Sequence, residues 1–381
     1  MRVQLSQKSL LVVFCGLHMC IFPARAADRI VDVDVSGGTA ALTALLVNPT
    51  GHKLYAGQQY TTEGNVSGLF VFDINSQGEI SDSDERSYPC MVPSGDKVWR
   101  TSVNCIAISP DRTKLYLGID YAAEEIKDTL IVYDLDEKGE PKGKPRSYKT
   151  GNPHFVLQTM AVHSKLNFLY TGGWGGAGVY AMPLKKGEPT NEPVDYGIGG
   201  QGKWTMVPND NFTAMFLGTY PSVIEVVNVN PSGEIEKLGS PCKVSELPEY
   251  LCLRRVGKCI YFTQAGKLWS WLFTGDLEPA GEPKAALTSW DAAHGLPPSA
   301  NNLFIDCMYS TKTSLYAVLA ETDKQAKNPV ALSFRIARFK PDAKGEIGKA
   351  EFVSAEPDTR HLNSITVDET SGVIYINAHK P

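Results

Sequence analysis

The stretch Val103-Asn-Cys-Ile-Ala-Ile-Ser-Pro-Asp-Arg-Thr-Lys-Leu-Tyr-Leu-Gly118 decides the fold. An apolar strand of alternating pattern runs into a tight polar turn, and a second strand follows through a Leu-Tyr pair. This pattern returns along the whole chain with an aromatic anchor in each second strand, at Tyr55, Tyr116, Tyr170, Phe216, Tyr261, Tyr316 and Tyr375. The steps between anchors are 61, 54, 46, 45, 55 and 59 residues. Each step is about the size of one four-stranded propeller blade.

A second feature of the repeat is a glycine turn before an acidic residue. It follows the third strand of a repeat at Gly78-Glu79, Gly139-Glu140, Gly233-Glu234 and Gly345-Glu346, with a shortened version at Lys186-Gly187-Glu188 and a degenerate one at Thr274-Gly-Asp276. Glycine fits here because such a turn needs a residue with positive φ. We interpret these turns as outer hairpins of the blades and assign them no chemistry.

The two ends of the chain complete the pattern. Arg29–Val35 reads as a strand that stands alone before the first repeat, and residues 364–368 and 373–378 give only two strands after the last one. A ring of blades must close, because open end strands expose unpaired backbone groups. The sequence therefore predicts an all-β, seven-bladed β-propeller in one domain, residues 27–381, whose last blade is closed by the N-terminal strand.

Residues 1–26 have the features of an export signal. Arg2 and Lys8 give a positive start, an apolar run follows, and Ala24-Arg25-Ala26 fits cleavage after Ala26. Of the 37 basic and 42 acidic side chains, cleavage removes three basic ones and leaves 34 against 42, a net charge of −8. The sequence predicts a periplasmic or secreted protein with no membrane span in the mature chain. The lack of a basic stripe argues against a nucleic-acid partner.

Six cysteines follow the signal, without a Cys-x-x-Cys or haem-attachment spacing. Cys252 and Cys259 flank an expected hairpin turn, so a disulfide between them and six free thiols are both compatible with the sequence.

At the quoted residues the chain resembles the seven-bladed lactonase-like propellers, including the YVTN-repeat group. Ser109-Pro-Asp111 with Leu115-Tyr-Leu117, and Val132-Tyr-Asp-Leu135 with Gly139, match their repeats best. The resemblance covers the whole mature chain but concerns the scaffold. It implies a family that includes lactonases, a cycloisomerase and subunits of redox complexes, and a fold does not by itself determine a function.

The loops that lead into the innermost strands are expected to form the mouth of a central channel. Counting back twelve residues from each anchor gives Thr43, Asn104, Gln158, Trp204, Glu249, Phe304 and Asn363, with Lys203 or Asn302 replacing Trp204 or Phe304 if the register shifts, and Tyr250 beside Glu249. Such a polar ring has two interpretations. It lines a water-filled channel and satisfies backbone groups, or it binds a ligand.

Four side chains near the expected mouth are candidates for catalysis. They are Arg100, His154, Glu249 and His361. A carboxylate, two imidazoles and a guanidinium could open a lactone or stabilise an oxyanion, as in a lactone hydrolase of the 6-phosphogluconolactonase-like type. The catalytic motifs of the resembled family are not matched at these positions.

No cofactor is evident in the sequence. Gly197-Ile-Gly199-Gly-Gln-Gly202 has the spacing of a dinucleotide site, but an expected strand follows it where that site needs a helix. A divalent cation held by oxygen atoms from separate blades would leave no local motif, so that option stays open.

Two functions are therefore compatible with the sequence. The first is an exported module that binds other protein subunits or a small-molecule ligand at the mouth, such as a non-catalytic subunit of a periplasmic redox complex. The second is a lactonase-type hydrolase acting on a sugar lactone or a related small acid.

Overall fold

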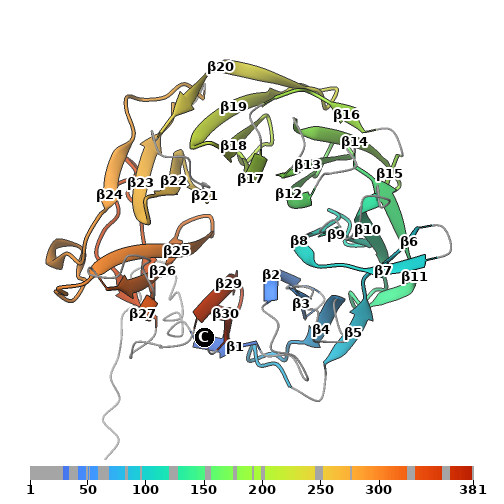
Figure 1. Cartoon of the computed structure of the whole chain (residues 1–381), viewed down its shortest axis with the longest axis horizontal. Helices are drawn as coiled ribbons and strands as arrows, with labels where there is room; N and C mark the ends of the chain where they lie inside the picture. Colours follow the sequence, from blue (N-terminus) through green and yellow to red (C-terminus); the bar gives the residue numbers. More distant parts are fainter. Residues whose placement is uncertain are drawn as a thin grey trace, which may run out of the picture.

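The repeated strands fold into small sheets arranged as a ring (Figure 1). The computed structural model describes residues 29–33, 42–48, 50, 52–58, 68–81, 85–94, 97–119, 128–150, 156–174, 178–190, 193–198, 202–244, 252–274, 277–323, 331–353 and 361–379, apart from some side chains within strands. Seven blades surround a central channel, two of them joined by a strand contact between Trp174 and Gly202, so the prediction of a seven-bladed β-propeller is confirmed.

The blades follow one another in chain order. Blade one consists of β2 (Leu42–Asn48), β3 (Lys53–Gln58), β4 (Gly68–Asp73) and β5 (Arg86–Pro89), and blade two of β8 (Val103–Ile108), β9 (Lys114–Ile119), β10 (Asp128–Leu135) and β11 (Pro141–Lys149). Blade three consists of β12 (Val156–His163), β13 (Phe168–Trp174), β14 (Tyr180–Lys185), β15 (Glu188–Pro189) and β16 (Val194–Asp195). Blade four consists of β17 (Gly202–Pro208), β18 (Ala214–Tyr220), β19 (Val223–Val229) and β20 (Ile235–Lys243). A hairpin of β6 (Met91–Ser94) and β7 (Lys97–Arg100) lies between blades one and two in the sequence.

The remaining strands complete the ring. Blade five consists of β21 (Leu253–Val256), β22 (Cys259–Gln264), β23 (Lys267–Leu272) and β24 (Lys284–Leu287). Blade six consists of β25 (Asn302–Ser310), β26 (Leu315–Thr322), β27 (Ala331–Phe339) and β28 (Glu351–Phe352). Blade seven consists of β29 (His361–Asp368), β30 (Val373–His379) and β1 (Arg29–Asp32). A short 3-10 helix, η2 (Ala292–His294), lies in the connection between blades five and six. No helix within the described ranges is long and apolar enough to cross a membrane.

The N-terminal strand closes the last blade, as the sequence predicts. β1 pairs with β30, with Arg29 opposite Val373 and Asp32 opposite Ile376. The pairing is parallel, and β1 is the outermost of three described strands in blade seven, where the other blades have at least four. The direction of β1 is a feature that the alternating sequence pattern could not reveal, because alternation is the same in both directions.

The aromatic anchors and the glycine turns form one device that joins neighbouring blades. Each of five anchors donates its phenolic hydroxyl to the carbonyl of a turn glycine in the next blade, over 2.7–3.0 Å: Tyr55 to Gly139, Tyr116 to Gly187, Tyr170 to Gly233, Tyr261 to Gly345 and Tyr375 to Gly78. These tyrosines are buried, and burial raises the pKa of Tyr55 to about 12, so the hydroxyl keeps the proton that it donates. We call each such pair a tyrosine latch.

The tyrosine latch also explains why each of these turns contains a glycine. All five turn glycines have φ between 75° and 86°, a region that favours glycine. A Cβ at Gly233 would lie 2.2 Å from the ring of Phe168, and one at Gly345 would lie 2.5 Å from Cys259 Sγ. The turn therefore needs glycine both for its backbone and for close approach to the neighbouring blade.

Two of the latches carry an additional ion network of the same design. Lys53 and Arg86 of blade one contact Glu140, which follows the latch glycine of blade two, and Asp73 completes the group. Lys114, Arg146, Asp134 and Glu188 repeat the arrangement between blades two and three. Hydrogen bonds from Arg146 and Lys114 lower the pKa of Asp134 to about 2.

Candidate functional site: the central channel

A β-bulge near the start of most inner strands sets the positions that face the channel. The pairing of inner strand with second strand skips one residue in five blades, at Thr43, Asn104, Gln158, Trp204 and Asn363. These are five of the seven positions found by counting back from the anchors. A bulge adds one residue to one strand and redirects its side chain, which is why such positions often lie beside functional sites.

In blades five and six the turn between the first and second strands is two residues shorter, so counting back twelve residues from the anchor misses the bulge. In blade two the anchor Tyr116 pairs with Ala107, nine residues earlier, whereas in blade six Tyr316 pairs with Tyr309, seven residues earlier. The bulge of β25 therefore contains Asp306 and Cys307 rather than Phe304. In blade five Tyr261 pairs with Arg254, and the equivalent position falls at residue 251, outside the described ranges, two residues after Glu249.

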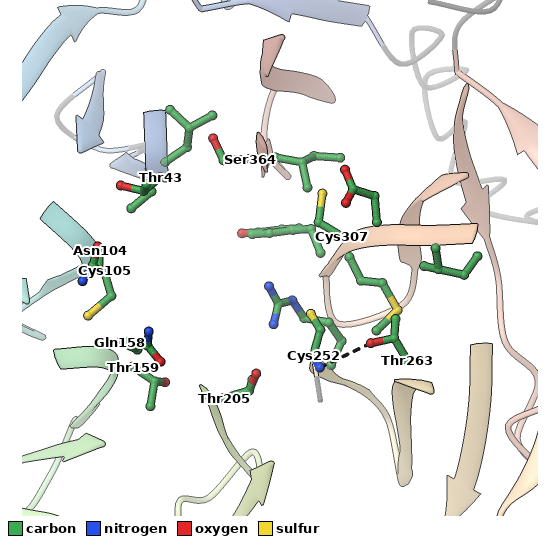
Figure 2. Close-up of a pocket in the computed structure, with 18 of the residues that line it drawn as sticks. Thr43, Asn104, Cys105, Gln158, Thr159, Thr205, Cys252, Thr263, Cys307 and Ser364 are labelled. Atoms are coloured by element: carbon green, nitrogen blue, oxygen red, sulfur yellow. Dashed lines mark hydrogen bonds between the residues drawn. The ribbon is translucent and has the colours of Figure 1, made fainter. Parts of the chain in front are cut away.

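The inner strands of all seven blades surround one cavity of about 840 Å³ (Figure 2). Asn104 and Gln158 line this cavity, and so does Phe304. Asn302 is exposed and lines a neighbouring pocket between blades five and six, so the shifted-register alternative does not place it in the channel. Arg254 and Asp306 also line the cavity and were missed by the count. The short turns 257–258 and 311–314 were visible in the sequence and could have corrected it.

One side of the channel carries neutral polar side chains. Thr43, Asn104, Gln158, Thr205 and Ser364 come from five different blades and lie along this side (Figure 2). Thr43 donates its hydroxyl to the backbone carbonyl of Val103 in the next blade. Gln158 Oε1 and Ser364 Oγ are buried and have no hydrogen-bond partner among the described residues. Buried polar atoms in native proteins normally have a partner, so these two atoms are candidates to bind a ligand or water.

The other side of the channel carries two cysteines and the charged side chains. Cys252 and Cys307 lie there (Figure 2), together with Arg254 and Asp306. Arg254 donates from Nη1 to the carbonyl of Leu253 over 2.7 Å. Burial raises the pKa of Cys307 well above its usual value, and the Asp306 carboxylate acts in the same direction while Arg254 opposes it. The Cys307 thiol is therefore protonated and is a poor nucleophile.

The four candidate catalytic residues stay predictions. Arg100 ends β7 and His361 begins β29, but their side chains lie outside the described part of the structure, as do His154 and Glu249 entirely. The same holds for Tyr250 and for the side chains of three further candidates of the channel, Lys203, Trp204 and Asn363.

The remaining candidates for chemistry are the cysteines and clusters of metal-ligating side chains. The described cysteines are all free thiols. Cys259 is buried between blades five and six, whereas the backbone carbonyl of Cys252 accepts a hydrogen bond from the backbone N–H of Thr263. The disulfide alternative for Cys252 and Cys259 is therefore not what the structure shows. Across the described ranges, no three His, Cys, Asp or Glu side chains are grouped so that they could hold a metal ion.

Comparison with known proteins supports the scaffold. No protein-family profile and no curated protein matches the chain in sequence. Among solved structures, a putative 6-phosphogluconolactonase from Bacteroides uniformis aligns with a TM-score of 0.57 and 15% identity over 84% of this chain and 87% of that one. A protein from Lactobacillus plantarum gives 0.55 and 14% over 83% and 86%. The β-propeller domain of Cps50 (Swd1) from Myceliophteria thermophila gives 0.52 and 11% over 88% and 96%.

These similarities concern the fold alone, because identities of 11–15% do not carry a function with them. They confirm the predicted resemblance to lactonase-like propellers at the level of the scaffold. The chain is thus a seven-bladed propeller whose neighbours include both lactonase-like proteins and a propeller of another kind.

Proposed function

We propose that this protein is an exported binding module that holds a small molecule in its central channel without catalysing a reaction on it. The observation that carries the proposal is the single cavity of about 840 Å³ to which all seven inner strands contribute. A cavity of this size falls within the range of ligand pockets in proteins, roughly 300–1,000 Å³. The bulges place polar side chains around it at equivalent positions of successive blades.

The residues around the cavity favour binding over catalysis. Among the described lining residues there is one carboxylate, Asp306, and no histidine. General acid–base catalysis needs a proton acceptor and a donor of suitable pKa on opposite sides of the reacting bond. We infer that the module serves as a non-catalytic subunit of an exported complex, with a partner protein seated at the mouth of the loaded channel.

A lactonase-type hydrolase is the second candidate, and one observation favours it. Arg254 and Asp306 bring a guanidinium and a carboxylate to the same wall of the cavity. There, Asp306 would activate water and Arg254 would stabilise the oxyanion of an opening lactone. The neighbour from Bacteroides uniformis bears the name of a putative enzyme that acts on such a lactone.

The two candidates are separated by measuring binding and turnover on the same protein. The mature chain, freed of small molecules by dialysis, is titrated calorimetrically with sugars, sugar acids and amino acids, and lactone hydrolysis is followed in parallel. We expect binding without turnover above the uncatalysed rate. Binding should be weakened in Gln158→Leu and unchanged in Asn302→Ala, because Gln158 lines the cavity and Asn302 does not.

Two outcomes would contradict the proposal. Lactone turnover that disappears in Asp306→Asn would establish the hydrolase. Failure of the wild-type protein to bind any class of probe would argue against a small-molecule ligand in the channel.

A further inference from the structure

The chemistry of the channel wall indicates which class of small molecule fits it. The neutral side presents amides and hydroxyls, from Asn104, Gln158, Thr205 and Ser364 among others. Amides and hydroxyls can both donate and accept hydrogen bonds. Leaving a buried polar atom without a partner costs about 1–3 kcal/mol, so Gln158 Oε1 and Ser364 Oγ favour an occupant that supplies hydrogen-bonding groups.

The charges of the wall compensate each other. Among the described lining residues the charged side chains are Arg254 and Asp306, one of each sign. Both lie close enough to Cys307 to act on its thiol in opposite directions. A charged ligand is bound well only where its charge meets an opposite charge that is not already compensated, because its desolvation costs several kcal/mol. The described part of the wall offers no such excess charge.

Aromatic and aliphatic groups complete the lining. Phe304 and Tyr309, both on β25, contribute rings to the wall, next to Ile305. Phe304 is held in place because its ring packs against Gly266, where a Cβ would lie 2.1 Å from the ring. The occupant therefore meets apolar surface as well as hydrogen-bonding groups, the usual composition of a specific ligand site.

We propose that the ligand of the channel is a neutral polyhydroxylated molecule, a saccharide without carboxylate or phosphate groups. Its hydroxyls both donate and accept, as the ring of amides and hydroxyls does, and its C–H faces pack on aromatic rings. This inference rests on the proposed function, since it names the class of molecule bound at the same site.

The test compares neutral and acidic probes by calorimetry. Glucose and maltose are the neutral probes, and gluconate and 6-phosphogluconate are the acidic ones. We expect a neutral probe to bind with an affinity that is the same at low and high salt, because no net charge attraction is available to be screened. Gln158→Leu should weaken binding by about tenfold or more, the equivalent of one or two lost hydrogen bonds.

The control variant is Asn302→Ala, which removes an exposed amide outside the cavity and should leave the affinity unchanged. Circular dichroism and the midpoint of urea unfolding verify that both variants are folded. Binding of gluconate or 6-phosphogluconate alone, lost in Gln158→Leu, would overturn the saccharide inference and leave the binding function intact. If neither glucose nor maltose binds in a manner that depends on Gln158, the saccharide inference fails. The binding function fails only if the sugar acids and amino acids do not bind either.

Discussion

The seams between blades and the central channel are built from the same sequence repeat. The seams repeat the same residues from blade to blade, whereas the channel positions carry different ones. Along the seams between blades, the same two groups meet five times, a tyrosine hydroxyl and a glycine carbonyl. Around the channel, equivalent bulge positions carry a threonine, an asparagine and a glutamine in successive blades. The comparison teaches that repetition marks the contacts that hold the ring together, whereas divergence at equivalent positions of the channel is what the proposed ligand binding predicts.

The seam between blades four and five is an exception that supports this interpretation. Its anchor is Phe216, which has no hydroxyl to donate, and the corresponding turn at residues 274–276 is the degenerate copy. Phe216 instead packs edge-on against Phe273, with ring centroids 4.8 Å apart, within an aromatic cluster. The turn keeps its backbone hydrogen bonds, but Leu277, at a φ of 66°, stands where the other turns have glycine. Loss of the hydroxyl thus coincides with loss of the glycine, as expected if the two form one contact.

The largest expected effect is at a latch. Tyr170→Phe removes the hydroxyl that donates to Gly233 over 2.8 Å and leaves a carbonyl without its partner. We expect the free energy of unfolding to fall by about 1–3 kcal/mol, measured by urea denaturation. The matched control is Phe216→Tyr, which adds a hydroxyl at the seam with the degenerate turn and should not stabilise the protein. Equal stability of Tyr170→Phe and wild type would show that the latch is not a joint.

A smaller effect is expected from the ion network between blades two and three. Asp134 has a pKa of about 2 in the folded protein because Arg146 and Lys114 hydrogen-bond to its carboxylate. The pKa of Asp134 in the unfolded chain is about 4, so between about pH 2 and pH 4 the unfolded state binds more protons than the folded state. The stabilisation is present above about pH 4 and is lost as the pH falls towards 2.

Urea midpoints of wild type and Asp134→Asn measured across this pH range test the network. The difference between the two proteins should be largest at the upper end and should shrink as the pH falls. A difference that does not change with pH would mean that Asp134 contributes through packing rather than through its charge.

The smallest effect on stability is expected in the channel. Gln158→Leu removes a buried amide oxygen that has no partner among the described residues. We expect the free energy of unfolding to change by less than about 1 kcal/mol, because no intramolecular hydrogen bond of that oxygen is lost. The same urea titration measures it. A loss as large as that of Tyr170→Phe would place Gln158 among the structural joints instead.

The sequence predicted those parts of the fold that repeat. The anchors, the positive-φ glycines and closure by the N-terminal strand were all visible, since each depends on local pattern and on the need to pair strand edges. It did not reveal that Tyr55 and its equivalents bind the glycine turn of the following blade. The two groups of that pair lie 84 residues apart, and only the packing of blades brings them together.

The channel was predictable only where the turns keep a constant length. Counting back from the anchor found Asn104 and Gln158, whose blades have the longer turn. It missed Asp306, because the turn in blade six is two residues shorter and moves the bulge relative to the anchor. Arg254 was missed because the count in blade five, even when corrected for the shorter turn, points to residue 251, three residues earlier.

Asn377 near the end of β30 has a consequence for how the chain is made. Its side-chain amide donates from Nδ2 to the carbonyl of Val33, 344 residues away, and its Oδ1 accepts from the backbone of Leu42. The contacts that seal the ring thus come from residues that are synthesised after the first six blades. A nascent chain can stack its blades as they appear, but it stays an unsealed arc until β30 has been synthesised and pairs with β1.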